Sequence, residues 1–289
     1  MTANHPKRTL IILSGKSLLG AYLTAVVGGC ALPPVARTPP PAEVPSAPAD
    51  AAKEIVLPYA PPAMKVFVPP ALPPTQPRVV TNGERTERKI ALTFDACSTR
   101  QPSYYDERVT KVLVDKGVRA TVFLGGKWVE ENADHARYLA SLPQFELGNH
   151  TFLHPHLTRV GDSRVRDELA WTQAAVYTVT GRQPLLFRAP YGEYDQRVVR
   201  LAADAGLTTI QYDVPSGDPD VHFTKELLLK NVLQHARAGS IVVMHINRRG
   251  WHTAEALPDI IDALRAKGFT LVTVGELLAK IAGDSMPGD

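Results

Sequence analysis

From Lys89 onward, apolar runs of strand length alternate with amphipathic stretches of helix length, and this alternation limits the folds open to the chain. Seven strand–helix units follow one another in order. Such a series favours a parallel sheet covered by helices. The predicted strands are 89–94, 120–124, 146–149, 185–188, 208–212, 240–245 and 270–274. The predicted helices are 104–116, 127–141, 163–180, 195–205, 225–238, 253–267 and 276–282.

Seven units in about 200 residues, with no obvious second core, favour a closed or nearly closed barrel over an open sheet. We therefore expect an α/β fold, a deformed TIM-like barrel of seven (β/α) units. In such barrels the catalytic residues gather where the strands end and the following loops begin. Polar residues capable of chemistry stand at five of these ends, namely Asp95, His150, Arg188, Asp213 and His245.

Two histidines, His150 and His154, are four residues apart directly after a predicted strand. Imidazoles at this spacing can converge on one metal ion. The spacing also arises by chance in a chain with 9 histidines, but here the pair accompanies the other polar strand ends. The pattern predicts a metal-dependent hydrolase.

The N-terminal region has the features of a signal peptide. Basic residues at Lys7, Arg8 and Lys16 accompany an apolar run over 17–27, which is too short for a permanent membrane span. The run closes at Cys30 in a Val-Gly-Gly-Cys sequence that resembles a bacterial lipobox. We predict a lipoprotein signal peptide over 1–29 with Cys30 lipidated; a plain cleaved signal peptide and an uncleaved anchor are the alternatives. With Cys30 acylated, the second cysteine, Cys97, has no disulfide partner.

Most of the chain's 25 prolines lie between Leu32 and Arg78, where no apolar periodicity is present. Such composition favours extended, disordered chain that spans about 3.1 Å per residue. We predict a Pro-rich tether over 30–80 and a catalytic domain over 81–284. The net charge of +3 and the lack of a long basic run argue against a nucleic-acid partner.

Five segments in order resemble the motifs of the polysaccharide deacetylase family with the NodB homology domain, carbohydrate esterase family 4. The resemblance covers roughly 88–282. Thr93-Phe94-Asp95-Ala96 resembles T-F-D-D, the segment from His150 to His154 resembles H-S/T-x-x-H, Arg188-Ala189-Pro190-Tyr191 resembles R-x-P-Y, Asp213 to Asp218 resembles D-x-x-S-x-D, and Val243-Met244-His245 stands where the family has L-x-H.

The resemblance implies hydrolysis of an acetyl group with the help of a metal. His150 and His154 would hold the metal as neutral imidazoles. Asp95 would be the general base that takes a proton from the attacking water, and Arg188 would orient Asp95 by a bidentate contact.

The same resemblance implies the source of the second proton and of the oxyanion hole. His245 would be the general acid for the departing nitrogen. Asp218 would keep the ring of His245 oriented and raise its pKa. Tyr191 would contribute its backbone amide to the oxyanion hole.

The chain departs from the family at Ala96, where the family's second aspartate coordinates the metal. Asp95, Cys97 or His156 could supply the third ligand, waters could fill the shell, or the site could have lost its function. We expect one divalent metal, zinc first, with cobalt and nickel as alternatives.

A second departure is Pro219, which stands where many members have a tryptophan. The absence of that tryptophan removes an aromatic wall from the substrate groove. Tyr191, Phe152 and Trp251 are then the candidates for substrate contact.

Together these observations predict a metal-dependent deacetylase that removes N-acetyl groups from an N-acetylglucosamine-containing, peptidoglycan-like glycan. An O-acetyl esterase on the same fold and a non-catalytic glycan-binding lipoprotein are the alternatives. We expect a monomer held in the bacterial cell envelope by a lipid anchor. In an organism with two membranes, Ala31 after Cys30 favours the outer membrane, with the domain facing the periplasm.

Overall fold

The computed structural model of the chain describes residues 62–98 and 103–279. All of them belong to one compact unit, Asp50–Asp289. The predicted signal peptide, Cys30 and the first part of the predicted tether lie outside the described residues.

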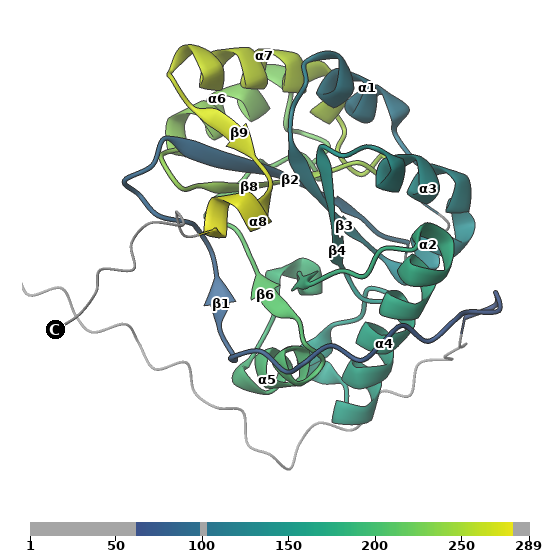
Figure 1. Cartoon of the computed structure of the whole chain (residues 1–289). Helices are drawn as coiled ribbons and strands as arrows, with labels where there is room; N and C mark the ends of the chain where they lie inside the picture. The colour runs from purple at the N-terminus through teal and green to yellow at the C-terminus, as the bar shows by residue number, and fades with distance from the viewer. Residues whose placement is uncertain (1–61, 99–102, 280–289) are drawn as a thin grey trace, which may run out of the picture. The chain divides into compact units, whose positions relative to one another are not determined.

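Nine strands in the described part of the chain form a single sheet in which every strand pair is parallel (Figure 1). The order is β1-β6-β5-β4-β3-β2-β8-β7, and β9 also pairs with β2. The strands are β1 (Val79–Val80), β2 (Lys89–Ala96), β3 (Ala120–Leu124), β4 (Phe145–Asn149), β5 (Leu186–Phe187), β6 (Thr208–Ile210), β7 (Val214–Pro215), β8 (Ile241–His245) and β9 (Thr270–Val272). The predicted parallel α/β barrel is confirmed.

Helices surround this sheet, and neighbours contact one another in the order α6, α7, α1 on one side and α3, α4, α5 on the other (Figure 1). No described helix is long and apolar enough to span a bilayer. The helices are α1 (Glu107–Asp115), α2 (Gly126–Glu131), α3 (Ala133–Ser141), α4 (Asp162–Thr180), α5 (Gln196–Asp204), α6 (Lys225–His235), α7 (Thr253–Ala266) and α8 (Val274–Leu278).

One predicted helix, 127–141, is two helices in the structure. Asn132 separates α2 from α3 with φ −129° and ψ 41°, outside the helical region. Its side-chain amide donates hydrogen bonds to the carbonyl oxygens of Trp128 and Ser103, both at 3.1 Å. These contacts satisfy a free carbonyl oxygen at the end of α2. The apolar pattern continues from α2 into α3, and for this reason periodicity alone does not reveal the break.

The curled sheet owes its shape to the segment from β6 to β7. Its first part, β6, pairs with β5 and β1, and its last part, β7, pairs with β8. Consecutive residues therefore connect the two ends of the strand order. Neither β1 nor β7 is among the seven predicted strands, because each has only two residues and carries no readable periodicity.

Alternation along β2 separates two apolar layers. One set of side chains faces the helices and joins the largest core cluster: Ile90, Leu92, Phe94 and Ala96. The other set faces the barrel interior, where Ala91 packs with Phe123, Ile210 and the α8 residues Val274 and Leu277. Asp95 follows the interior set, so the strand directs its carboxylate into the barrel.

Residues 62–80, assigned to the disordered tether by their composition, lie along the folded domain (Figure 1). Thr75 donates its amide to the carbonyl of Ala203 at 2.9 Å and its hydroxyl to that of Leu207 at 3.2 Å. Gly206, at φ +76°, makes this approach feasible, because a Cβ there would lie 2.3 Å from the Cβ of Leu72. This part of the predicted tether therefore packs on the domain instead of holding it at a distance.

Removing residues 1–80 should destabilise the domain more than removing residues 1–61. The longer deletion takes away β1 and several hydrogen bonds, each worth about 1 kcal/mol. At about 2–4 °C per kcal/mol for a chain of this size, we expect a difference of roughly 5–10 °C in Tm. Differential scanning calorimetry of the two shortened chains measures it, and equal Tm values would show that residues 62–80 add nothing to stability.

Candidate active site

Four of the five polar strand ends meet at the carboxyl edge of the sheet. Asp95 lies in β2 and is the register partner of His245 in β8, while His150 follows β4 and Arg188 follows β5. Asp213 does not join them. Its carboxylate accepts hydrogen bonds from the Ile241 amide at the start of β8 and from Arg85, at 2.9 and 2.7 Å. Asp213 therefore binds the segment before β7 to the amino end of β8, away from the site.

The Asp95 carboxylate is buried and ion-paired. Arg188 donates one hydrogen bond from Nη1 to Asp95 Oδ1 at 2.9 Å, and Asp95 Oδ2 lies 3.7 Å from His150 Nε2. The predicted bidentate contact is wrong, because Nη1 also donates to Thr93 Oγ1 at 2.8 Å and Nη2 is directed at the carbonyl of Gln211. Burial on its own would raise the pKa of Asp95, but the charge and hydrogen bond of Arg188, together with the charge of His245, hold it below its usual range. Asp95 is therefore ionised and able to accept a proton.

The guanidinium of Arg188 is completely buried. It lies over the ring of Phe123, 4.1 Å from its centroid, and also near Tyr212. A buried charge is tolerated only with a partner, and removing one member of such a pair leaves the other uncompensated at a cost of about 3–5 kcal/mol. Arg188 and Asp95 thus depend on each other for the stability of the barrel interior.

His150 and His154 lie on a strained loop that turns their rings toward each other. Thr151 and His154 have φ values of +63° and +57°, in the left-handed region. The imidazole centroids are 5.0 Å apart. His150 Nδ1 donates to the carbonyl of Arg188 at 2.9 Å, which leaves Nε2 directed toward Asp95. Burial lowers the pKa of both rings, that of His154 to about 2, so both are neutral as metal ligands must be.

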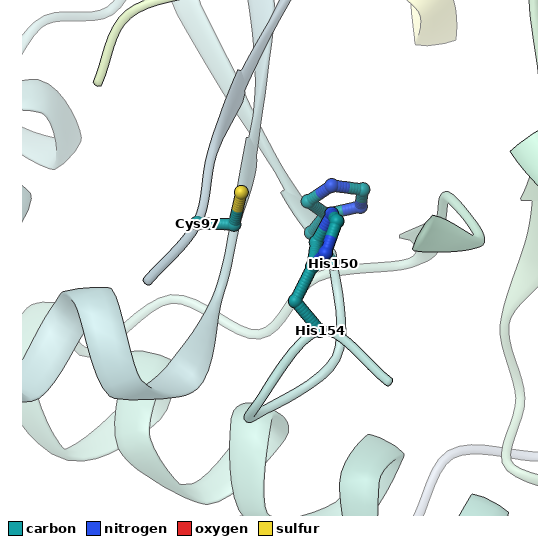
Figure 2. A group of neighbouring side chains, drawn as sticks. All are labelled: Cys97, His150 and His154. Carbon is teal, nitrogen blue, oxygen red and sulfur yellow. The ribbon is translucent and has the colours of Figure 1, made fainter. Parts of the chain in front are cut away.

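Cys97 completes a group of three metal-ligating side chains (Figure 2). One ligand atom from each of Cys97, His150 and His154 lies within 4.8 Å of the others. Nδ1 of His154 is buried and has no hydrogen-bond partner among the described residues. A thiol and two imidazoles grouped in this way fit a soft or borderline divalent cation. Burial raises the pKa of the Cys97 thiol to about 12, with the charge of Arg249 acting in the opposite direction.

His156, another candidate for the third ligand, lies elsewhere. Its Nδ1 is 2.7 Å from Glu193 Oε2, and its ring stacks on Tyr191 with centroids 4.1 Å apart. Tyr191 itself has φ +59° in a short 3-10 turn, Pro190–Gly192, and its side chain is half exposed. The stacked rings of His156 and Tyr191 border the site, because the ring centroid of Tyr191 lies 4.5 Å from that of His154.

His245 and Asp218 form a second pair across the site from the two histidines. His245 Nδ1 lies 2.9 Å from Asp218 Oδ1, and the His245 amide donates to Oδ2 at 2.7 Å. Hydroxyl groups of Ser216 and Thr253 also donate to this carboxylate. Burial alone would lower the pKa of His245, but the charge and hydrogen bond of Asp218 outweigh it and raise the pKa. His245 therefore retains a proton to higher pH than a free imidazole.

The three aromatic candidates for substrate contact have different environments. Phe152 is buried in the main core cluster and packs edge-on against Trp171, so its assignment to substrate contact is wrong. Tyr191 and Trp251 are half exposed. The amide of Trp251 donates to the carbonyl of Asp218 at 3.0 Å, which keeps this aromatic side chain beside the His245 pair.

Comparison with known proteins decides the family. The family model of polysaccharide deacetylases matches residues 82–210. The chain is also similar to the Xyl-CE4 domain of a multidomain xylanase from the hindgut metagenome of Trinervitermes trinervoides, with 30% identity and a TM-score of 0.58. That similarity covers 66% of this chain and 89% of the other. The chain belongs to the polysaccharide deacetylase family.

Two further relatives of this polysaccharide deacetylase domain differ in what their names state. The peptidoglycan-N-acetylglucosamine deacetylase PgdA of Listeria monocytogenes is 31% identical over 249 residues, 82% of this chain. The chain spans 48% of the length of that relative. A solved CE4 family pseudoenzyme from Bacillus anthracis is 28% identical with a TM-score of 0.64, covering 71% of this chain and 70% of the other.

Several residues outside the family motifs hold the candidate site in place. Glu168 on α4 is fully buried and accepts hydrogen bonds from the amides of Phe152 and Leu153 at 2.6 and 2.7 Å. Its other oxygen pairs with Arg164 at 2.7 Å. Asn247 likewise donates to the carbonyl of Cys97 at 2.7 Å. The only sequence signal for Glu168 is a carboxylate within the apolar face of a helix, which does not identify its partners.

Replacing Glu168 with alanine should destabilise the domain by about 3–5 kcal/mol, because it removes the buried carboxylate that accepts from two loop amides and pairs with Arg164. Denaturant unfolding followed by circular dichroism measures the loss. Asp167→Asn, one position earlier on the same helix, is the matched control and should change stability by less than about 0.5 kcal/mol. Similar values for the two variants would contradict the role assigned to Glu168.

Proposed function

We propose that the domain is a metal-dependent deacetylase that hydrolyses N-acetyl groups on N-acetylglucosamine in a peptidoglycan-like envelope glycan. One observation carries the proposal. The ionised Asp95 lies between two groups with different chemical roles. The neutral histidines after β4 lie on one side of it, and on the other side lies His245 of β8, paired with Asp218 from the loop after β7. A base, a metal-ligating cluster and an acid thus face one region at the carboxyl edge of the sheet.

Hydrolysis of an acetamide adds water to the carbonyl carbon, breaks the carbon–nitrogen bond and delivers a proton to the nitrogen. Asp95 is suited to take the proton from the attacking water, because its ion pair with Arg188 keeps it ionised. His150 and His154 would hold the divalent cation. When bound, that cation supplies Lewis acidity to the carbonyl and lowers the pKa of water.

His245 is suited to protonate the departing nitrogen. Its Nδ1 is engaged by Asp218, so the proton on its other ring nitrogen is the one available to substrate. The raised pKa keeps this proton in place to higher pH than in a free imidazole. The left-handed turn at Tyr191 supports the assignment of its backbone amide to the oxyanion, since such turns expose an amide to a nearby anion.

The choice of a peptidoglycan-like glycan rests on relatives and on the predicted anchor. Names of the Listeria relative and of a 29% identical Bacillus subtilis relative state deacetylation of peptidoglycan N-acetylglucosamine and N-acetylmuramic acid. A lipidated Cys30 would keep the domain beside the envelope glycan, on the periplasmic face of the outer membrane in an organism with two membranes. The protein would act there as a monomer. The half-exposed Tyr191 and Trp251 offer sugar-stacking surfaces at the site.

A non-catalytic glycan-binding protein is the second candidate. Ala96 removes the family's usual carboxylate ligand, and a similar solved structure is a pseudoenzyme. An O-acetyl esterase is a third candidate on the same residues, because an ester needs the same metal and base but less help for its leaving group.

Acetate release by the full-length protein distinguishes these functions. We expect release from acetylated chitooligosaccharide and from peptidoglycan, loss of that release with a chelator, and recovery with added zinc or cobalt. An enzymatic acetate assay together with mass spectrometry of the glycan measures it. Glycan binding without acetate release under all conditions would favour the binding protein, and release only from O-acetylated glycan would favour the esterase.

His245→Ala should lower kcat by about 10²–10⁴-fold, the usual contribution of a positioned general acid. The fold should be retained, because His245 is partly exposed and its Asp218 partner keeps other donors. Steady-state kinetics and a thermal melt test both statements. His235→Ala, at an exposed position on α6, is the control and should match the unchanged protein. Full activity of His245→Ala would remove the acid assignment.

Asp218→Asn should move the alkaline limb of the pH–rate profile to lower pH. His245 must be protonated to act, so activity falls as the pH rises through its pKa. The Asp218 charge raises that pKa against the effect of burial, with Asp95 acting in the same direction and Arg249 against it. Profiles of kcat/KM against pH measure the shift, and Asp220→Asn, at an exposed position two residues later, is the control. An unmoved limb in Asp218→Asn would show that the limb does not report His245.

A further inference from the structure

We propose that the Cys97 thiolate is the third protein ligand of the metal, replacing the carboxylate that the family places at position 96. The inference rests on the proposed metal dependence and extends it to a ligand set of one sulfur and two imidazole nitrogens. Its basis is the convergence of Cys97, His150 and His154 from two different strand ends (Figure 2).

Strand alternation explains why position 97 reaches the site and position 96 does not. Ala96 is the last residue of β2 and packs with Phe94 in the cluster facing the helices. Side chains two positions apart along a strand share a face, so Cys97 follows Asp95 toward the barrel interior. A regular strand through Ala96 therefore gives up a ligand at one position and makes the next position available.

The geometry of the three side chains is close to that of a metal site. Their ligand atoms lie within 4.8 Å of one another, against roughly 3.3–3.6 Å expected between neighbouring ligands of a tetrahedral zinc. All three lie at the ends of strands or in a loop held by buried groups. Asn247 fixes Cys97 through its carbonyl and lies 3.5 Å from Sγ, and Glu168 fixes the histidine loop.

The other candidates for the third position are already engaged. Asp95 directs one oxygen to Arg188 at 2.9 Å, and its charge is needed there to balance a buried guanidinium. His156 pairs with Glu193 and stacks on Tyr191. By contrast, no hydrogen bond to a described residue engages Nδ1 of His154. A thiolate with two imidazoles selects zinc or cobalt over magnesium or calcium, which prefer oxygen ligands.

Cobalt spectroscopy on the full chain carrying Cys30→Ser tests the inference without an activity measurement. The chain has 2 cysteines, so Cys97 is then the sole thiol. Titration with Co²⁺ should produce a sulfur-to-cobalt charge-transfer band in the near ultraviolet, saturating at one metal per chain and disappearing when Zn²⁺ is added in excess.

Two variants on the same background make the assignment specific. Adding Cys97→Ser should abolish the charge-transfer band and weaken zinc binding by more than about 100-fold, beyond the effect usual for residues that only support a ligand. His156→Ala should leave the band and the affinity unchanged. Isothermal titration calorimetry measures the affinities, and the spectrum of the Cys97-containing chain remains decisive even where Cys97→Ser fails to fold.

The possible results separate this inference from the proposed function. A stoichiometric charge-transfer band that depends on Cys97 supports the thiolate ligand. Cobalt bound with d–d bands alone overturns it, while chelator-sensitive acetate release would still uphold the metal-dependent deacetylase. Absence of cobalt binding also overturns the inference, and the acetate assay then decides independently whether the domain hydrolyses its glycan.

Discussion

The buried guanidinium of Arg188 is the constraint on which the site depends. Nη1 of Arg188 donates a hydrogen bond to the Asp95 carboxylate, and the backbone carbonyl of Arg188 accepts one from the His150 ring and orients it. One residue after β5 thus sets the position of the Asp95 carboxylate on β2 and of the His150 imidazole after β4. Because an unpaired charge in this interior would cost several kcal/mol, the ion pair can be kept only with the barrel closed around it. The geometry of the candidate site and the stability of the fold are therefore coupled at Arg188.

The alternation of strands and helices could be predicted from sequence because buried parallel strands are apolar runs. The same reasoning located Asp95, His150, Arg188 and His245, since parallel strands bring their carboxyl ends to one edge. It was wrong for Asp213. Asp213 lies in the segment that leaves the pairing of β6 and enters the pairing of β7 with β8. There its side chain contacts the amino end of β8 instead of the carboxyl edge, and only the pairing with β8 reveals this.

Other parts of the structure follow from tertiary contacts that no local pattern encodes. Residues 62–80 are rich in proline and lack periodicity, yet Thr75 and β1 pair with the domain through backbone groups that every sequence carries. Glu168 belongs to none of the five motifs, although it holds the loop between the two histidines. In both cases a hydrogen bond to the backbone fixes the arrangement, and such bonds place few demands on residue type.

Ala96 and Cys97 show how a local backbone choice can redistribute chemistry along a strand. Ala96 ends β2 and packs with Phe94 and the other apolar side chains that face the helices. The regular strand then brings a buried thiol into the neighbourhood of two neutral imidazoles. Exchanging a hard oxygen ligand for a soft sulfur ligand would narrow the range of metals that the site binds. The charge of the site would not change, because a thiolate and a carboxylate each carry one negative charge. Loss of the family's aspartate is therefore compatible with a retained metal site, provided that the ligand is taken from the adjacent position on the opposite face of the strand.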